Sequence, residues 1–192
     1  MAPFARLILL LATPISGFPS AAATGMVWVS FLFMPPSQIE PTYHTAIWLE
    51  DQRGTLVKTL FVSHDLSSME YRMGDACPDW VNQAHWEKAE PSLVDAVTGP
   101  TPHVGSGALA FDVAKLNVAA GTYQFKLQVH IADKYNVLYT GRLSIGGASN
   151  EATLEKLYSP SRPPGGTEFV RDVRARYAPE PPTQPRSARH VW

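Results

Sequence analysis

Residues 121–147 show hydrophobic and polar positions that alternate in two successive runs. In residues 123–131 the odd positions are apolar and the even positions are polar, and residues 137–145 repeat the alternation after the polar pair Asp133 and Lys134. A period of two is typical of strands that bury one face and expose the other. The pattern predicts a long β-hairpin with a solvent-exposed polar face. Because an isolated hairpin is barely stable in water, we expect a second sheet to cover the apolar face.

Shorter runs predict further strands. Residues 26–34 are rich in β-branched and aromatic side chains, which predicts a strand buried on both sides or nearly so. Residues 44–50 and 55–62 predict a second hairpin, because Gly54 between them can adopt the positive φ that short hairpin loops require. Residues 107–113 predict another strand. We expect the second hairpin to form the sheet that packs against the long hairpin.

The last predicted strand covers residues 167–177. Its apolar positions share one face, and Arg174 and Arg176 point the other way. Outward charge discourages edge-to-edge pairing, so the sequence predicts an edge strand. We expect Arg174 and Arg176 to lie in a surface for a partner, with strand addition as the physical route.

Between the two hairpins the strand pattern fades. Pro78 opens a run that Pro91 ends, and this run predicts one short helix that lays Trp80 on the sheets. Residues 95–102 predict a turn-rich loop. The fold class predicted from all these elements is all-β: an immunoglobulin-like antiparallel β-sandwich of about seven strands with one short helical insertion.

The first residues are typical of a secretory signal. A positive charge at Arg6 precedes an apolar run that ends in small residues, so we expect a signal peptide at residues 1–23, cleaved on export. A single β-sandwich domain then covers residues 24–177, and the proline-rich residues 178–192 predict a disordered tail. We expect a periplasmic protein with no integral membrane segment after cleavage, because the apolar run is shorter than a membrane span.

Charge and cysteine content narrow the function classes. The chain has 16 Lys+Arg and 17 Asp+Glu, and a formal net charge of −1 argues against a nucleic-acid partner. Cys77 is the single cysteine. An internal disulfide is therefore impossible, and packing has to stabilise the exported domain.

Two segments carry a family resemblance. Residues 47–51 (IWLED) run into Gly54, and residues 95–99 (DAVTG) are followed by Thr101. With the hairpins around them, these segments resemble the predicted periplasmic proteins of the DUF2271 family over residues 43–149.

The resemblance implies an exported sandwich of unknown function. Similar proteins tend to be encoded near PepSY membrane proteins and flavin transferases, which implies an accessory role in periplasmic redox or metal handling. The chain departs from the family where Phe111, Asp112 and Val113 replace the usual Trp-Asp-Gly before the last hairpin.

Common catalytic signatures are absent from the sequence: it has no glycine-rich phosphate loop, no GxSxG, no HExxH and no CxxC. We therefore expect a protein that is not an enzyme. A hydrolase is the third hypothesis, with Asp95, Thr98 and His103 as its candidate residues. A turn held by Asp and Thr side chains explains the same segment without catalysis.

One cluster has the composition of a copper site. His64, Met69, Met73 and Cys77 follow one another at spacings of five, four and four, so a helix would align the last three on one face. Imidazole, thioether and thiolate ligands suit Cu(I). The alternative is that the methionines fill gaps in the core and Cys77 acts as a small apolar residue. No other cofactor is predicted.

A second candidate is a ligand patch formed by the two hairpins. His130 and Lys126 share the polar face of the long hairpin, and His44 and Trp48 share a face of the other hairpin. If the faces adjoin, the four side chains form a polar and aromatic patch. Solvated side chains, with Trp48 packed under a loop, are the alternative.

The leading functional hypothesis is a non-catalytic binding module that engages a protein partner at the inner membrane. A periplasmic carrier of copper or of a small ligand is the second hypothesis, and the hydrolase is the third.

Overall fold

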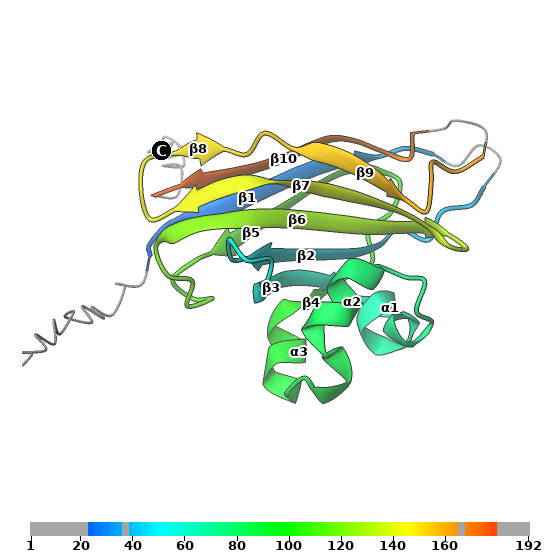
Figure 1. Ribbon diagram of the computed structural model, residues 1–192, viewed down its shortest axis with the longest axis horizontal. Coiled ribbons are helices and arrows are strands. Elements are labelled where there is room, and N and C mark those ends of the chain that lie inside the picture. The colour runs from blue at the N-terminus through cyan, green and yellow to red at the C-terminus, as the bar shows by residue number, and fades with distance from the viewer. Residues whose placement is uncertain (1–22, 36–38, 165–167, 180–192) are drawn as a thin grey trace, which may run out of the picture.

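The computed structural model describes residues 23–35, 39–164 and 168–179. Two β-sheets pack face to face, and short helices lie against one of them (Figure 1). The fold is all-β, as predicted. Residues 1–22 of the predicted signal peptide and residues 180–192 of the predicted tail lie outside the described residues. Ala178, predicted as the first residue of the tail, belongs to the last strand.

The larger sheet contains six strands: β2 (His44–Glu50), β3 (Leu56–Ser63), β4 (Thr98–Gly99), β6 (Gly121–Ala132), β7 (Tyr135–Ile145) and β9 (Glu155–Ser159). Their order is β4-β3-β2-β6-β7-β9, and only the β3–β4 pair is parallel. The predicted long hairpin is β6 and β7, and its turn begins at Asp133, whose φ is 49°. Gly54 has a φ of 80° in the other predicted turn.

The smaller sheet contains four strands: β1 (Met26–Phe33), β5 (Gly105–Asp112), β8 (Asn150–Glu151) and β10 (Val170–Ala178). Their order is β5-β1-β10-β8. Each strand predicted from the sequence has a counterpart in one of the two sheets. The short strands β4, β8 and β9 were not predicted, because two to five residues are too few to show a period.

The main core lies between the two sheets. The apolar side of β6, including Phe125 and Ile131, faces the apolar side of β1, including Val27 and Phe33, and all four side chains are buried. Burial alternates along β1, whereas Trp28 between the core positions is exposed. The prediction that this strand is buried on both sides or nearly so is therefore wrong, because no described element covers its other face.

The expected partner sheet is also different from the observed one. Hairpin β2–β3 does not pack on the long hairpin; β2 pairs with β6 within one sheet, with Ile47 opposite Leu127. Strands β1, β5 and β10 provide the opposing layer. Alternation identifies the apolar face of each hairpin. It does not show whether two hairpins pair edge to edge within one sheet or stack face to face as two sheets, so the sequence pattern could not distinguish these two arrangements.

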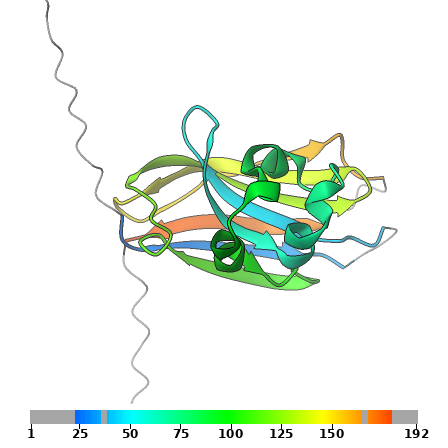
Figure 2. The same ribbon diagram turned by 90° about the horizontal axis from the view of Figure 1, so that it is seen from below.

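Residues 64–97 form a helical layer on the outer face of the larger sheet (Figure 2). Its elements are α1 (His64–Ser68), η1 (Glu70–Arg72), α2 (Pro78–Ala84), η2 (Trp86–Lys88) and α3 (Pro91–Val97). The prediction of one helix is wrong: Pro91 begins α3 instead of ending a helix, because proline is tolerated in the first turn. Trp80 lies on the sheet as predicted, in a second core with Trp48 and Trp86.

The edge prediction for the last strand holds only in part. Strand β10 pairs with β1 along its length and with β8 at Arg176 and Tyr177. Among the described residues, the two edge strands of the smaller sheet are β5 and the two-residue β8. Strand addition at β10 is therefore obstructed where β8 lies.

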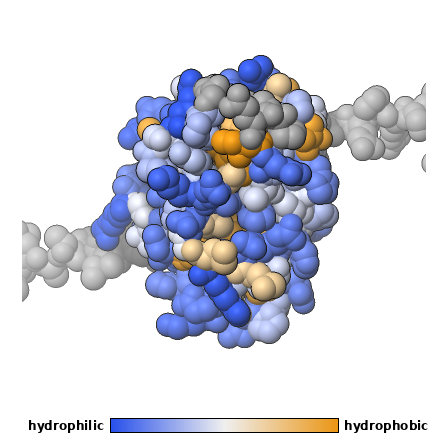
Figure 3. Space-filling view, turned by 90° about the vertical axis from the view of Figure 1, so that its right-hand side faces the viewer, coloured by the Kyte–Doolittle hydropathy of each residue, from blue (hydrophilic) through white to orange (hydrophobic). Residues whose placement is uncertain are grey.

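No helix in the described part of the chain is long and apolar enough to cross a membrane. Figure 3 views the end of the molecule that carries the β6–β7 turn, where polar side chains predominate and apolar surface is confined to small patches.

Candidate functional site

The structure brings together the four residues of the predicted ligand patch. Strand pairing places His44 opposite His130 and Trp48 opposite Lys126, on the outer face of the larger sheet. The helical layer covers this region: the exposed fraction is 0% for Trp48, 8% for His44 and 7% for His130. The two faces adjoin as the hypothesis requires, but the patch they form is largely closed to solvent.

Two polar side chains of the long hairpin attach the helical layer to the sheet. Gln128 is fully buried, and its Oε1 accepts hydrogen bonds from the backbone N–H groups of Asp79 and Trp80. Asn136 Oδ1 accepts from the backbone N–H of Cys77 at 3.0 Å. The prediction that Gln128 and His130 face solvent is wrong, because such side chains can be buried when every polar atom finds a partner.

A buried carboxylate marks the border of the helical cover. Glu50 Oε2 lies 3.5 Å from Lys126 Nζ, and Glu50 Oε1 accepts hydrogen bonds from Trp48 Nε1 at 2.8 Å and Gln83 Nε2 at 2.9 Å. Gln83 of α2 also accepts from the backbone N–H of Leu56. A buried charge needs such partners to offset its desolvation. Lys126 is thereby engaged within the fold.

The two patch histidines stack with ring centroids 5.7 Å apart. His130 is bonded through Nδ1 to the Thr42 hydroxyl and through Nε2 to the Asp133 carbonyl, whereas His44 Nδ1 has no partner in the described residues. Burial, and to a smaller extent His130, lower the pKa of His44. The described residues contain no group of three His, Cys, Asp or Glu side chains that could hold a metal ion.

The structure separates the members of the predicted copper cluster. His64, Met69 and Met73 are exposed, and each methionine has an exposed fraction of 69%. Cys77 is fully buried, and its Sγ donates weakly to the carbonyls of His44 and Gln128 at 3.4 and 3.5 Å. Burial raises the pKa of this thiol. No continuous helix joins the four residues, because α1 ends at Ser68 and α2 begins at Pro78.

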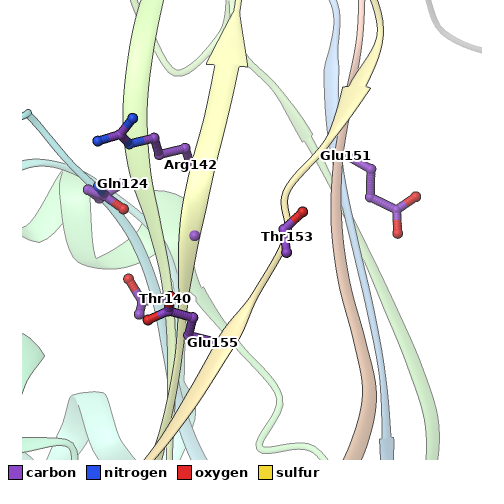
Figure 4. Close-up of a pocket in the computed structure, with 7 residues that line it drawn as sticks. Gln124, Thr140, Arg142, Glu151, Thr153 and Glu155 are labelled. Atoms are coloured by element: carbon purple, nitrogen blue, oxygen red, sulfur yellow. The ribbon is translucent and has the colours of Figure 1, made fainter.

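The outer face of the larger sheet is open beyond the helical layer, and it holds a polar groove. This groove has a volume of about 550 Å³, and Figure 4 shows Arg142 beside Gln124 on one side, Thr140 with Glu155 at one end, and Glu151 turned away. The lining residues are Gln124, Thr140, Gly141, Arg142, Glu151, Thr153 and Glu155. An adjoining hollow of about 370 Å³ shares Gln124 and Arg142 and adds Gln52, Thr122 and Tyr123.

Strand pairing explains how the groove forms. Arg142 lies opposite Gln124, and Thr140 lies between its partners Lys126 and Glu155. The strand β9 pairs with β7 only up to Thr140, so the chain leaves the sheet there and opens the groove. A side chain at Gly141 would collide with the Thr153 carbonyl, so glycine permits the chain to cross at this point.

Arg142 is the distinctive group of the groove. Its side chain is exposed and forms no ion pair with any described residue. A free guanidinium presents several N–H donors, and the neighbouring glutamine, threonine and glutamate side chains add donors and acceptors. We call the surface lined by these two hollows the Arg142 groove. The arrangement can hydrogen-bond a polar ligand through its guanidinium, amide, hydroxyl and carboxylate groups.

Sequence reasoning did not single out the Arg142 groove. Gln124 and Arg142 were assigned to polar faces. The turn at Asp133 alone would place Gln124 opposite Leu143, and a register shift between His130 and Ala132 brings Arg142 opposite Gln124 instead. Glu151 and Glu155 come from a segment without a clear period. Nothing in the local pattern shows that this segment crosses from one sheet to the other.

The candidate hydrolase residues are dispersed. Asp95 is exposed on α3, and His103 is exposed in the loop before β5. Neither forms a hydrogen bond or ion pair with a described residue, and the Thr98 hydroxyl is buried without a partner. The segment 95–99, expected to be a turn-rich loop, forms the end of α3 and all of β4.

Arg174 and Arg176 lie on the outer face of the smaller sheet, where Arg176 is opposite Glu151 of β8. Both are exposed and alternate with the buried Ala175 and Tyr177. The structure therefore confirms that the arginines point away from the core, and it places them on a different sheet from the His44 patch.

Comparison with known families decides the family. The profile described as "Predicted periplasmic protein (DUF2271)" matches residues 33–157. The chain belongs to the DUF2271 family. This family description agrees with a periplasmic location, and the match includes every residue that lines the Arg142 groove. No curated protein and no solved structure matches the chain.

Proposed function

We propose that this DUF2271 protein is an exported, non-catalytic binding module of the immunoglobulin-like type that engages a protein partner at the inner membrane. The observation that carries the proposal is the Arg142 groove, with an unpaired guanidinium among hydrogen-bonding side chains. The Arg142 guanidinium forms no ion pair with a described residue, so it is free to bind a ligand or partner.

The polarity of the groove favours a polypeptide over a small molecule. Pockets for small ligands are mostly apolar, whereas Tyr123 is the one aromatic side chain in this lining. The amide and hydroxyl groups of Gln124 and Thr140 can bond to peptide groups, and Arg142 and Glu155 complement side chains of either charge. An extended polar segment of the partner fits this mixture best.

The family resemblance supports the choice of system. Similar proteins tend to be encoded near PepSY membrane proteins and flavin transferases, so we propose that the partner belongs to a membrane redox or metal-handling system. The chain itself supplies recognition in this proposal, and the chemistry belongs to the partner.

Site-specific cross-linking tests the proposal in the full chain. A photoreactive amino acid at Gln124 is expected to capture one membrane protein in the cells that produce the chain. Arg142→Glu reverses the charge beside the probe and should abolish the product. Arg53→Glu, in the exposed β2–β3 turn, is the matched control and should leave it unchanged. A product that survives Arg142→Glu, or no product from Gln124, contradicts the proposal.

A further inference from the structure

The outer face of the smaller sheet carries a second set of unused groups. In the views of Figures 1 and 2 the helices lie against the larger sheet, and no described element covers the other outer face. Strands β1, β5 and β10 arrange most of this face in three columns, and Glu151 of β8 lies beside Arg176 at its edge. We call it the Trp28 face, and its residues are Trp28, Ser30 and Leu32 of β1, Ser106, Ala108 and Ala110 of β5, and Arg171, Arg174 and Arg176 of β10.

Trp28 is the one large apolar side chain exposed on this face, with an exposed fraction of 36%. It lies between Ala110 and Arg176, its partners on the two neighbouring strands. Its indole forms no hydrogen bond and no ring contact with any described residue. Ala110 is too short to cover the indole, so the exposed part of the ring is available to a ligand.

The two arginines beside Trp28 are also unpaired. Arg174 and Arg176 are exposed and form no ion pair with a described residue, whereas Arg171 is bonded to Glu168 at 3.2 Å. Outward side chains two apart on a strand are spaced by about 7 Å, and neighbouring strands by about 4.8 Å. The two guanidinium groups and the indole thus lie within the span of two adjacent sugar rings.

We propose that the Trp28 face binds an acidic oligosaccharide. The indole ring stacks on one sugar ring, and Arg174 and Arg176 bind carboxylates of that sugar and its neighbour through paired N–H donors. The two guanidinium groups outweigh the Glu151 carboxylate opposite Arg176, so charge complementarity selects the acidic sugar. This inference goes beyond the proposed function, because it uses the opposite sheet, and Trp28, Arg174 and Arg176 all lie outside the residues that match the family.

The composition of the face argues for a glycan over a lipid surface. The other large apolar side chains exposed in the described residues, Val57, Met69, Met73, Val104 and Leu157, belong to none of its three columns. A single partly exposed indole offers too little apolar area to insert into a bilayer. One ring with flanking small residues instead matches the size of one sugar ring.

Calorimetric titration with an oligogalacturonate tests this inference. We expect binding that weakens as salt rises, and that weakens about tenfold in Arg174→Ala and again in Arg176→Ala, because each variant removes a charge-assisted contact. Trp28→Ala should abolish binding, and Trp28→Phe should retain part of it. Arg53→Ala is the matched control and should bind like the parent chain, as should Arg142→Ala, which separates this site from the groove.

A neutral cello-oligosaccharide and vesicles of phosphatidylglycerol and phosphatidylcholine complete the experiment. Neither should bind. Equal binding of the neutral sugar, preferential binding to the vesicles, absence of oligogalacturonate binding at millimolar concentration, or unchanged affinity in both arginine variants would overturn the inference. Thermal unfolding of each variant shows that the fold is kept.

Discussion

The two sheets turn different outer faces to the surroundings. On the larger sheet, the polar residues Gln128 and Asn136 are buried under the helical layer and bonded to its backbone. On the smaller sheet, Trp28 and the arginines at 174 and 176 remain exposed. Polar side chains thus attach the helical layer to the outer face of the larger sheet, whereas an aromatic side chain is exposed on the uncovered outer face of the smaller sheet. Side-chain polarity alone is a poor guide to which face of a sheet is open.

The comparison also separates two kinds of tryptophan. Trp80 is fully buried, its Nε1 donates to the Thr59 hydroxyl at 3.1 Å, and its ring centroid lies 5.1 Å from that of Trp86. Trp28 has none of these contacts. Replacing Trp80, which packs between the sheet and the helical layer, should therefore lower the stability of the fold. Replacing Trp28 should instead weaken ligand binding.

Replacing these tryptophans gives the largest expected effect. Trp80→Ala should lower the free energy of unfolding by about 3–5 kcal/mol, because it leaves a cavity in the second core and removes the bond to Thr59. Trp28→Ala, the matched control on the bare face, should cost no more than about 1 kcal/mol. Denaturation by urea, followed by circular dichroism, measures both. Similar losses for the two variants would contradict the distinction between the faces.

Two glutamines of β6, one under the helical layer and one beyond it, test the same comparison through a smaller expected change in the free energy of unfolding. Gln128→Ala should lower the free energy of unfolding by about 1–3 kcal/mol, because the Asp79 N–H loses its acceptor inside the protein and the Trp80 N–H keeps only the Cys77 carbonyl. Gln124→Ala, on the same strand face but beyond the helical cover, should change it by less than about 0.5 kcal/mol. The same urea experiment applies. Equal effects at the two positions would mean that the helical layer does not depend on Gln128.

Much of the fold follows from the sequence, and the reason is local. The period of two along β6 and β7 is strong because every second side chain enters one core, and Gly54 and Asp133 mark tight turns. The strand pairing could not be predicted in the same way. Whether β2 lies beside β6 or on top of it depends on contacts between distant segments, which a single alternating run does not record.

The candidate site was less accessible to sequence reasoning. Alternation assigned His44 and Trp48 to one hairpin face and Lys126 and His130 to another, and the ligand patch was a hypothesis that required these faces to adjoin. They adjoin because β2 pairs with β6, which alternation does not record. Their burial depends on a layer of five short helical elements, of which the sequence predicted one, because the others are too short to show a helical period. The Arg142 groove depends on the place where the chain crosses between sheets, and that crossing leaves no signal in the polar positions themselves.

The copper hypothesis gives the smallest expected effect, namely no change at all. In the folded protein Cys77 has no exposed surface and a raised thiol pKa, whereas Met69 and Met73 point to solvent. Thiolate is the form that binds metal, so assembling these ligands would require the second core to open. A Cu(I) titration under reducing conditions should therefore find no binding tighter than micromolar, and Met73→Ala should behave like the parent chain. Tight binding that Met73→Ala abolishes would show that the covered face opens, and it would revive the carrier hypothesis.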